Sequence, residues 1–339
     1  MRERHKWYQS KRNSLRDSFV KYKRNLQLNW LDEASSRSIR NAINNANLVI
    51  DNHHFKIKFR SKKDLKQSYQ DEISTNRYFQ IKENGFKLSK VAGNITTKCK
   101  LPFKPQSKAK NIRITLDKQG RYWVSLAVEI DVKTKHQNTT TDHIGIDLGV
   151  KNLIVTSDNE YFNRVNVSRF EKRLKRFQRK SAKHYILMRN DRTKIKSKRL
   201  LKLEYKIRQL YEKITNITDN NIHKITSTLI KRNPKTIVVE DFKVSELIKR
   251  NKHNHKFVNI LNKCKFYEIL WQLKYKCEMN DIKFIVANKW YPSSKLCSNC
   301  GSKKIKLSLS TRLYKCEYCE FEIDRDLNAA LNLKKLALI

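Results

Sequence analysis

The spacing of hydrophobic residues predicts a helical region at the start of the chain. Up to about residue 53, apolar residues recur at mostly three- and four-residue steps between basic residues. Trp7, Phe19, Ile39 and Ile43 belong to this pattern. On a helix, this period gathers the apolar side chains into one stripe. We therefore predict helix over this region.

Between residues 55 and 130 the period changes to two, which is typical of β-strands. Apolar and polar residues alternate at 55–59, 112–116 and 124–130, and the segments 77–81 and 86–88 are interpreted as the two strands of a hairpin. Asn84-Gly85 is a turn sequence of two-residue hairpins, and Lys118-Gln119-Gly120 separates the last two runs. Several antiparallel strands in succession predict a small β-barrel. The polar stretch 133–142 is interpreted as a linker.

The second half of the chain alternates predicted strands with predicted helices. Short apolar strands are expected at 144–147, 153–156, 236–240 and 283–287. Neither Gly nor Pro occurs from residue 167 to 231, where apolar residues at three- and four-residue steps predict a long helix. Further helices are expected at 257–280 and 327–338. This order predicts an α/β architecture.

The charge of the chain points to a polyanionic partner. Its 339 residues include 75 Lys and Arg against 32 Asp and Glu, a net charge of +43. Such an excess strains a compact fold unless a polyanion neutralises it, and it is typical of nucleic-acid-binding proteins. No apolar run approaches the ~18 residues of a membrane span, and none follows the charged N-terminus as in a signal peptide. We therefore expect a cytoplasmic, nucleoid-associated protein without a membrane partner.

Basic residues are densest in the predicted helical segment from 164 to 213. It holds nineteen Lys and Arg and four Asp and Glu, too few anions for pairing within the helix. One interpretation is a solvated helix face, and the other is a wall that follows the backbone of a nucleic-acid duplex. Under the second, Arg173, Arg176 and Arg179 are candidate nucleic-acid contacts. Phe177 is interpreted as a packing residue rather than a base-stacking one.

Four of the seven cysteines form a metal-binding pattern. Cys297 and Cys300 are a C-x-x-C pair, and Cys316 and Cys319 are a second pair, with fifteen residues between the two pairs. This spacing is typical of a tetrahedral Zn²⁺ site, and Gly301 allows the tight turn that brings the thiolates together. With four ligands the zinc is expected to be structural.

Three carboxylates occupy the ends of predicted elements. Asp147 and Glu240 each end an apolar strand, and Asp326 lies at the start of the last helix. Three such residues can hold two Mg²⁺ ions about 4 Å apart around a phosphodiester. Each also has a structural alternative: a turn residue for Asp147, an ion pair for Glu240, and a helix cap for Asp326. Asp324 is the nearest rival of Asp326.

Several motifs together resemble the TnpB family of transposon-encoded RNA-guided DNA nucleases, which are similar to compact type V CRISPR effectors. They are GIDLGVKN at 145–152, VVED at 238–241, YPSSKLCSNCG at 291–301, YKCEYC at 314–319 and DRDLNAA at 324–330. The resemblance implies a split RuvC nuclease domain of RNase H-like fold. It also implies that Asp147, Glu240 and Asp326 are the metal ligands, and it favours Asp326 over Asp324.

The resemblance is looser before residue 143. Family members begin with a strand that completes the barrel, whereas LDEA at 31–34 resembles the region before their second recognition helix. We therefore expect the chain to begin inside the helical part. The segment from 59 to 68 resembles the one that reads the short motif beside the target, with Lys63 and Gln67 as candidate contacts.

The predicted fold is an α/β RNase H-like (RuvC) nuclease domain with an inserted zinc ribbon, plus an N-terminal β-barrel with a helical insertion. The predicted parts are a helical recognition region (1–54), a wedge-like barrel (55–132), the linker (133–142), the RuvC domain (143–290 and 323–339) and the ribbon (291–322).

The expected function is RNA-guided cleavage of double-stranded DNA beside a short flanking motif, by two-metal-ion hydrolysis that leaves a 5′-phosphate. The expected partner is a guide RNA from the transposon end, with one protein per guide RNA or a dimer. There are three alternatives. The first is a nuclease-dead RNA-guided repressor, and the second is an unguided zinc-ribbon nucleic-acid-binding protein. The third is a transposase, which would share the fold, but the segment between Glu240 and Asp326 holds a zinc ribbon rather than an evident strand-transfer module.

Overall fold

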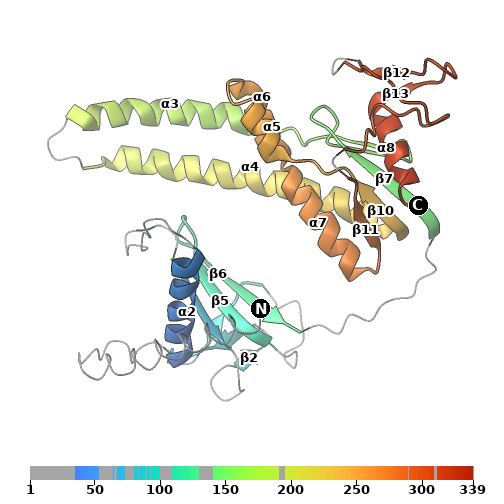
Figure 1. The fold of residues 1–339 in the computed structure, drawn as a ribbon. Coiled ribbons are helices and arrows are strands. Elements are labelled where there is room, and N and C mark those ends of the chain that lie inside the picture. Colours follow the sequence, from blue (N-terminus) through green and yellow to red (C-terminus); the bar gives the residue numbers. More distant parts are fainter. Residues whose placement is uncertain are drawn as a thin grey trace. The chain divides into compact units, whose positions relative to one another are not determined.

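The computed structural model describes residues 35–52, 64, 67–72, 80–82, 84–88, 90–91, 93–99, 109–129, 140–190, 195–288, 290–308 and 311–338. The chain divides into two compact units, Met1–Asp131 and Val132–Ile339, which are described separately (Figure 1). The helix predicted before residue 35 and the strand predicted at 55–59 lie outside the described residues.

The described part of the first unit combines a helix with two antiparallel sheets. Helix α2 (Ser36–Asn52) confirms the end of the predicted helical region. Ser35 ties its start to strand β1, because its Oγ accepts from the Ser38 amide at 3.1 Å and donates to Asp71 Oδ2 at 2.8 Å. The sheets have the orders β1-β5-β6 and β2-β3-β4. Their strands are β1 (Gln67–Glu72), β2 (Gln80–Lys82), β3 (Gly85–Lys87), β4 (Ile95–Thr96), β5 (Ala109–Leu116) and β6 (Tyr122–Val128). The described residues do not show these strands closing into the predicted barrel.

The predicted hairpin around Asn84-Gly85 forms, but its turn lies one residue earlier than expected. Lys82 pairs with Gly85, so Gly85 is already a residue of β3. A Cβ atom on Gly85 would lie 2.2 Å from the carbonyl oxygen of Ile95 in β4. The glycine therefore permits the close approach of a neighbouring strand, a role that the turn sequence alone does not reveal.

A five-stranded sheet forms the centre of the second unit, with the order β11-β10-β7-β8-β9. Its strands are β7 (Thr140–Leu148), β8 (Ile154–Thr156), β9 (Tyr161–Phe162), β10 (Pro234–Val239) and β11 (Lys283–Val286). Strands β7, β8 and β9 are antiparallel neighbours, whereas β10 runs parallel to β7 and β11 parallel to β10. The stretch interpreted as a linker overlaps β7, because Thr140 pairs with Pro234 of β10. The first four residues of β7, 140–143, are polar, and its apolar residues start only at Ile144. The sequence pattern therefore does not reveal where this strand begins.

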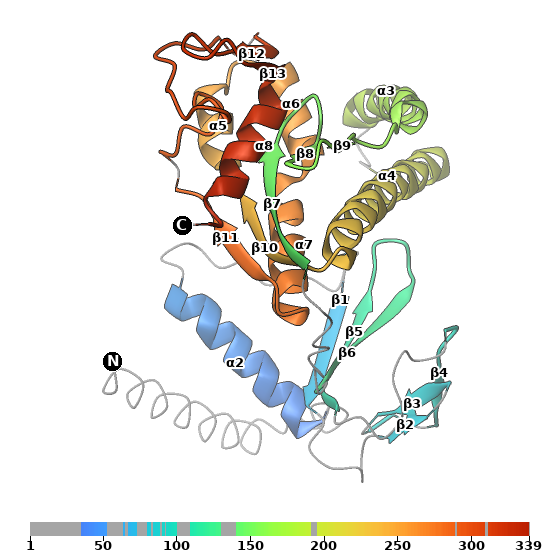
Figure 2. The same ribbon diagram turned by 90° about the vertical axis from the view of Figure 1, so that its right-hand side faces the viewer.

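Helices cover both faces of this sheet (Figure 2). The helices are α3 (Ser168–Asn190), α4 (Lys198–Lys231), α5 (Val244–Arg250), α6 (His255–Cys264), α7 (Phe266–Met279) and α8 (Arg325–Lys335). Along β10, Ile237 and Val239 face the main core with α4, α6 and α7, while Val238 packs with Leu333 of α8 on the other face. This alternation makes the sheet a middle layer.

The helix predicted at 257–280 is two helices, α6 and α7. Lys265 separates them with a left-handed backbone (φ 52°), a conformation that is uncommon for a residue other than glycine. The Lys265 ammonium pairs with Asp219 of α4, which fixes the break by a tertiary contact. Lysine has a good helix propensity, so nothing local marks this position.

Helices α3 and α4 form a long antiparallel hairpin. The predicted apolar stripe of α4 is confirmed: Leu210 packs with Leu174 and Phe177 of α3 in a small core. Phe177 is thus a packing residue, as expected. Among the described helices, none is long and apolar enough to cross a bilayer.

Candidate functional site

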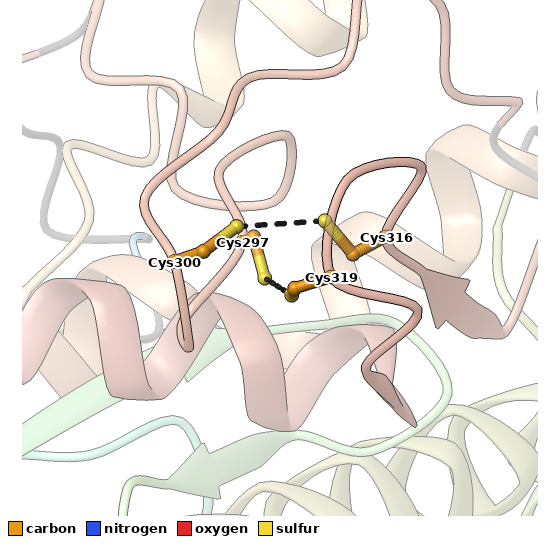
Figure 3. Close-up of side chains that lie close together, drawn as sticks. All are labelled: Cys297, Cys300, Cys316 and Cys319. Atoms are coloured by element: carbon orange, nitrogen blue, oxygen red, sulfur yellow. Dashed lines mark hydrogen bonds between the residues drawn. The ribbon is translucent and has the colours of Figure 1, made fainter.

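The four cysteines converge, as their spacing predicts (Figure 3). Their sulfur atoms lie within 4.8 Å of one another, with 3.7 Å from Cys297 to Cys319 and 3.6 Å from Cys300 to Cys316. Four sulfurs about 2.3 Å from a tetrahedral Zn²⁺ would lie about 3.8 Å apart, whereas a disulfide requires about 2.05 Å. The donor set and its geometry therefore fit a zinc ion.

Hydrogen-bond donors beside the sulfurs favour the thiolate form that zinc requires. Ser302 Oγ lies 3.1 Å from Sγ of both Cys300 and Cys316. This hydroxyl is the main cause that lowers the pKa of Cys300 and brings that of Cys316 to about 6. Burial instead raises the pKa of Cys297 to about 11. Gly301 has a φ of 78°, which confirms its place in the tight turn.

Asp147 and Glu240 occupy neighbouring positions on β7 and just after β10, because Ile146 and Val239 before them are paired in parallel register. Glu240 directly follows the end of β10, as expected. Asp147 does not end its strand, because β7 continues to Leu148 and Asp147 pairs with Val155 of β8. The two carboxyl groups are close enough to share a hydrogen bond. The pKa of Asp147 is raised well above its usual range by burial and then by the charges of Glu240 and Asp326. Burial also raises the pKa of Glu240.

Asp324 and Asp326 have different surroundings. Asp324 precedes α8 and caps it, because its Oδ1 accepts from the amides of Asp326 (3.0 Å) and Leu327 (3.1 Å). Asp326 lies in the first turn, and its carboxylate faces the charge of Asp147 and the Arg312 guanidinium, 3.6 Å away. The capping role that the sequence left open for Asp326 therefore belongs to Asp324.

The three carboxylates form a second set of possible metal ligands. Carboxylate oxygens are hard donors of the kind that Mg²⁺ prefers. Because crowded carboxylates raise one another's pKa, a divalent cation between them offsets their repulsion. The donor set therefore fits magnesium.

Helix α8 lies directly against β7 at Gly145, two residues before Asp147. A Cβ atom there would lie 2.0 Å from the carbonyl oxygen of Ala330 and 2.4 Å from the amide nitrogen of Lys334. Both atoms belong to the backbone, so the helix would have to move. Gly145 thus sets the distance between the strand of Asp147 and the helix of Asp326.

We expect Gly145→Ala to lower the free energy of unfolding by about 3 kcal/mol and to reduce cleavage, because α8 must shift. Gly120→Ala is the control. No atom lies within 4 Å of a Cβ there, and its φ of 81° costs only about 1–2 kcal/mol. Urea titrations followed by circular dichroism would measure both variants. An unchanged unfolding midpoint for Gly145→Ala would contradict the close approach.

The structure places the candidate nucleic-acid contacts at separate locations. Lys63 lies outside the described residues. Gln67 begins β1, and its Nε2 donates to the Asp64 carbonyl at 3.0 Å. Arg173, Arg176 and Arg179 are exposed on α3. The guanidinium groups of Arg173 and Arg176 lie 5.5 and 5.7 Å from the ring centre of Phe177, which holds them by cation–π attraction.

Sequence reasoning missed several residues around the carboxylates. Arg312 pairs with Asp326, and the charge of Arg325 partly opposes the burial that raises the pKa of Asp147 and of Glu240. Tyr161 of β9 is close enough to Asp324 to share a hydrogen bond. Arg325 alone carried a signal, because it stands between the two aspartates in the sequence.

Comparison with known proteins matches most of the second unit to two family models. A model described as "Probable transposase" matches residues 125–251, which include Asp147 and Glu240. A model described as "Cas12f1-like, TNB domain" matches residues 266–333, which include the four cysteines and Asp326. These matches bear out the resemblance of the chain to the TnpB family.

Curated relatives agree with this assignment. A putative RNA-guided DNA endonuclease of Streptomyces pristinaespiralis is 27% identical over 318 residues, which cover 93% of this chain and 75% of that protein. The putative RNA-guided DNA endonuclease InsQ of Escherichia coli K12 is 29% identical, with 63% and 53% covered. A TnpB-like protein of Methanocaldococcus jannaschii is 28% identical, with 56% and 67% covered. The chain thus spans from about half to three quarters of the length of these relatives.

Proposed function

We propose that this chain is an RNA-guided DNA endonuclease that hydrolyses phosphodiesters at Asp147, Glu240 and Asp326. The observation that carries the proposal is the meeting of these carboxylates at one edge of the sheet, in a chain with a net charge of +43. Two relatives, from Streptomyces and E. coli, are named as putative RNA-guided DNA endonucleases, which supports the same activity. Carboxylates grouped within so basic a chain favour a metal-dependent nuclease over a simple binding protein.

The sheet topology supports an RNase H-like domain of the RuvC type. Three antiparallel strands, β7 to β9, are followed along the chain by two parallel strands that add on the other side of β7. This order places the ends of β7 and β10 side by side at the middle of the sheet. The cysteine segment enters between β11 and α8, so it forms the ribbon inserted into this domain.

Asp147, Glu240 and Asp326 would hold two Mg²⁺ ions. When bound, these ions supply Lewis-acid stabilisation and an activated water for hydrolysis that leaves a 5′-phosphate. Asp147 and Glu240 present oxygens from adjacent strands, and Asp326 approaches from α8. Burial raises the pKa of the strand carboxylates, and the charge of Arg325 beside them partly opposes this shift.

The basic hairpin α3–α4 is proposed to follow the backbone of the guide–target duplex. Under this proposal the guide RNA reads the target sequence by base pairing, and the protein reads duplex shape and a short flanking motif. Gln67 and Lys63 remain the candidates for that motif. The partners are a guide RNA from the transposon end and double-stranded DNA, with one protein per guide.

The test of this function begins with the RNA that co-purifies with the protein. Sequencing it should reveal one species that carries a constant scaffold and a variable segment. The purified complex should then cut a plasmid that matches this segment beside a randomised flank, and it should need Mg²⁺. A protein that co-purifies with no defined RNA, or that cuts matched and unmatched plasmids alike, would contradict the proposal.

Salt should weaken guide binding strongly, because phosphate contacts release counterions. With ~6–10 phosphates contacted, affinity should fall roughly 10³–10⁵-fold between 50 and 200 mM salt. The double variant Arg173→Ala with Arg176→Ala should weaken binding to all targets about equally. It should also flatten the slope of log Kd against log salt by about two.

A matched control removes two cations from the opposite edge of the sheet. Lys235 and Lys283 are exposed near the starts of β10 and β11, away from the carboxylate edge. Their double alanine variant should leave the slope within about 0.5 of the wild type if those lysines touch no phosphate. Equal slopes for both double variants would indicate that the α3 arginines lie on a solvated helix face and contact no phosphate.

A further inference from the structure

Buried asparagines join helix α8 to the loop that carries the first two cysteines. Asn328 is completely buried, and it contacts the loop through both ends of its amide. Its Oδ1 accepts from the Ser298 amide at 2.9 Å, and its Nδ2 donates to the Leu296 carbonyl at 2.6 Å. These two residues flank the predicted zinc ligand Cys297. The asparagine therefore holds the backbone on both sides of a ligand.

Asn332 repeats the contact one helical turn later. It is 2% exposed, and its Nδ2 donates to the carbonyls of Ser293 and Leu296, both at 2.8 Å. The backbone carbonyl of Asn332 accepts a hydrogen bond from the Tyr291 hydroxyl at 3.0 Å. Lys335 extends the same helix face, because its Nζ donates to the Ser298 carbonyl at 2.6 Å. Residues three and four apart share one face of a helix, so this face lies along the loop.

These contacts fix the register of α8 in a way that apolar packing would not. Hydrogen bonds are directional, so a small slide or rotation of the helix breaks them. Apolar side chains tolerate such shifts with less loss, because dispersion contacts are not directional. The opposite side of α8 is held by its close approach to β7 at Gly145. The helix is thus constrained from both sides, and Asp326 lies two residues before Asn328.

We propose that Asn328 and Asn332 are positioning residues. They hold Asp326 beside Asp147 and Glu240 when the zinc-binding loop is ordered, and they no longer do so when it is disordered. An ordered loop presents the carbonyl and amide groups that the asparagines require. A disordered loop releases α8, and Asp326 then leaves the other carboxylates. This inference rests on the proposed function, since it assigns Asp326 to the metal site of that reaction.

The first test measures hydrogen–deuterium exchange of residues 325–335 in the full chain, zinc-loaded and zinc-depleted. In the wild type, zinc removal should speed exchange in α8 at least about tenfold, because the loop no longer holds the helix. In Asn328→Ala and Asn332→Ala, exchange should already be fast with zinc bound and should respond less than about threefold to its removal. Either variant suffices if the other does not fold.

Leu333→Ala is the matched control for simple destabilisation. Leu333 is fully buried on the same helix, but it packs with Val238 and Ala287 rather than with the loop. This variant should exchange faster than the wild type and yet keep its tenfold response to zinc. If the asparagine variants keep the same response as Leu333→Ala, the asparagines only stabilise the helix and the inference fails.

The second test measures the Mg²⁺ concentration that gives half-maximal cleavage. It should rise about tenfold in Asn328→Ala and Asn332→Ala, with target binding unchanged, and should stay at the wild-type value in Leu333→Ala. A wild-type Mg²⁺ requirement in both asparagine variants would overturn the inference. A wild-type protein that does not cleave at all would instead contradict the proposed function, and the exchange measurement would still decide whether the loop positions α8.

Discussion

Asp326→Ala is expected to reduce target cleavage at least ~10³-fold while leaving guide and target binding nearly unchanged. A metal ion that stabilises transition-state charge supplies several kcal/mol, and each 1.4 kcal/mol corresponds to about tenfold in rate. Asp147→Ala and Glu240→Ala should have the same effect, because all three residues belong to one site. The basic surface of α3 is untouched by these changes, so binding should persist.

Asp324→Ala is the matched control for Asp326→Ala. Asp324 caps α8 through two amide hydrogen bonds, and losing a cap costs about 1 kcal/mol. The variant should therefore be slightly less stable and keep cleavage within about tenfold of the wild type. Single-turnover cleavage and filter-binding assays on the same preparations separate the two effects. Cleavage at the wild-type rate by Asp326→Ala, together with its loss in Asp324→Ala, would reverse the assignment.

Cys316→Ser is expected to remove zinc and to abolish cleavage through loss of structure. Binding of a structural zinc contributes on the order of 10 kcal/mol of local folding free energy, and serine is a far poorer ligand than a thiolate. Helix α8 begins one residue after β13 (Glu322–Asp324), which pairs with β12 (Leu313–Lys315) beside the cysteines. An unfolded ribbon should therefore also misplace Asp326.

Elemental analysis and limited proteolysis check this expectation. Wild-type protein should contain about one zinc per chain and should resist proteolysis within residues 291–322. The Cys316→Ser variant should lack the zinc and should be cut by the protease in this segment. Cys99→Ser is the control, because Cys99 is an exposed cysteine outside the cluster. A folded, active wild-type protein without zinc would contradict this account of the ribbon.

The parts of the site that were predicted from sequence depend on short-range signals. The apolar run before Glu240 marks the end of β10, whereas β7 continues one residue beyond Asp147. Parallel pairing of Ile146 with Val239 then brings the two carboxylates together. The spacing of the cysteines alone predicts a metal-binding arrangement, because two C-x-x-C turns suffice to group four thiolates. The family resemblance favoured Asp326 over Asp324, and the capping hydrogen bonds of Asp324 give a physical reason for that choice.

The features that sequence reasoning missed depend on tertiary contacts. The break at Lys265 follows from packing and from an ion pair with a distant aspartate. Gly85 and Gly145 are required by backbone atoms of other elements, so their roles emerge only once those elements are placed. Asn328 and Asn332 did carry a signal that was overlooked. Two amides four residues apart, between alanine and leucine residues of the last helix, indicate a buried polar contact.

The central claim is that a guide RNA directs this chain to cut DNA at the site formed by Asp147, Glu240 and Asp326. The most direct measurement is to replace the variable segment of the co-purified RNA and to map the cut on a plasmid that carries both the old and the new target. The account predicts that the cut moves to the new target, requires Mg²⁺ and disappears in Asp326→Ala. A cut that stays at the old target, or that persists in Asp326→Ala, would contradict it.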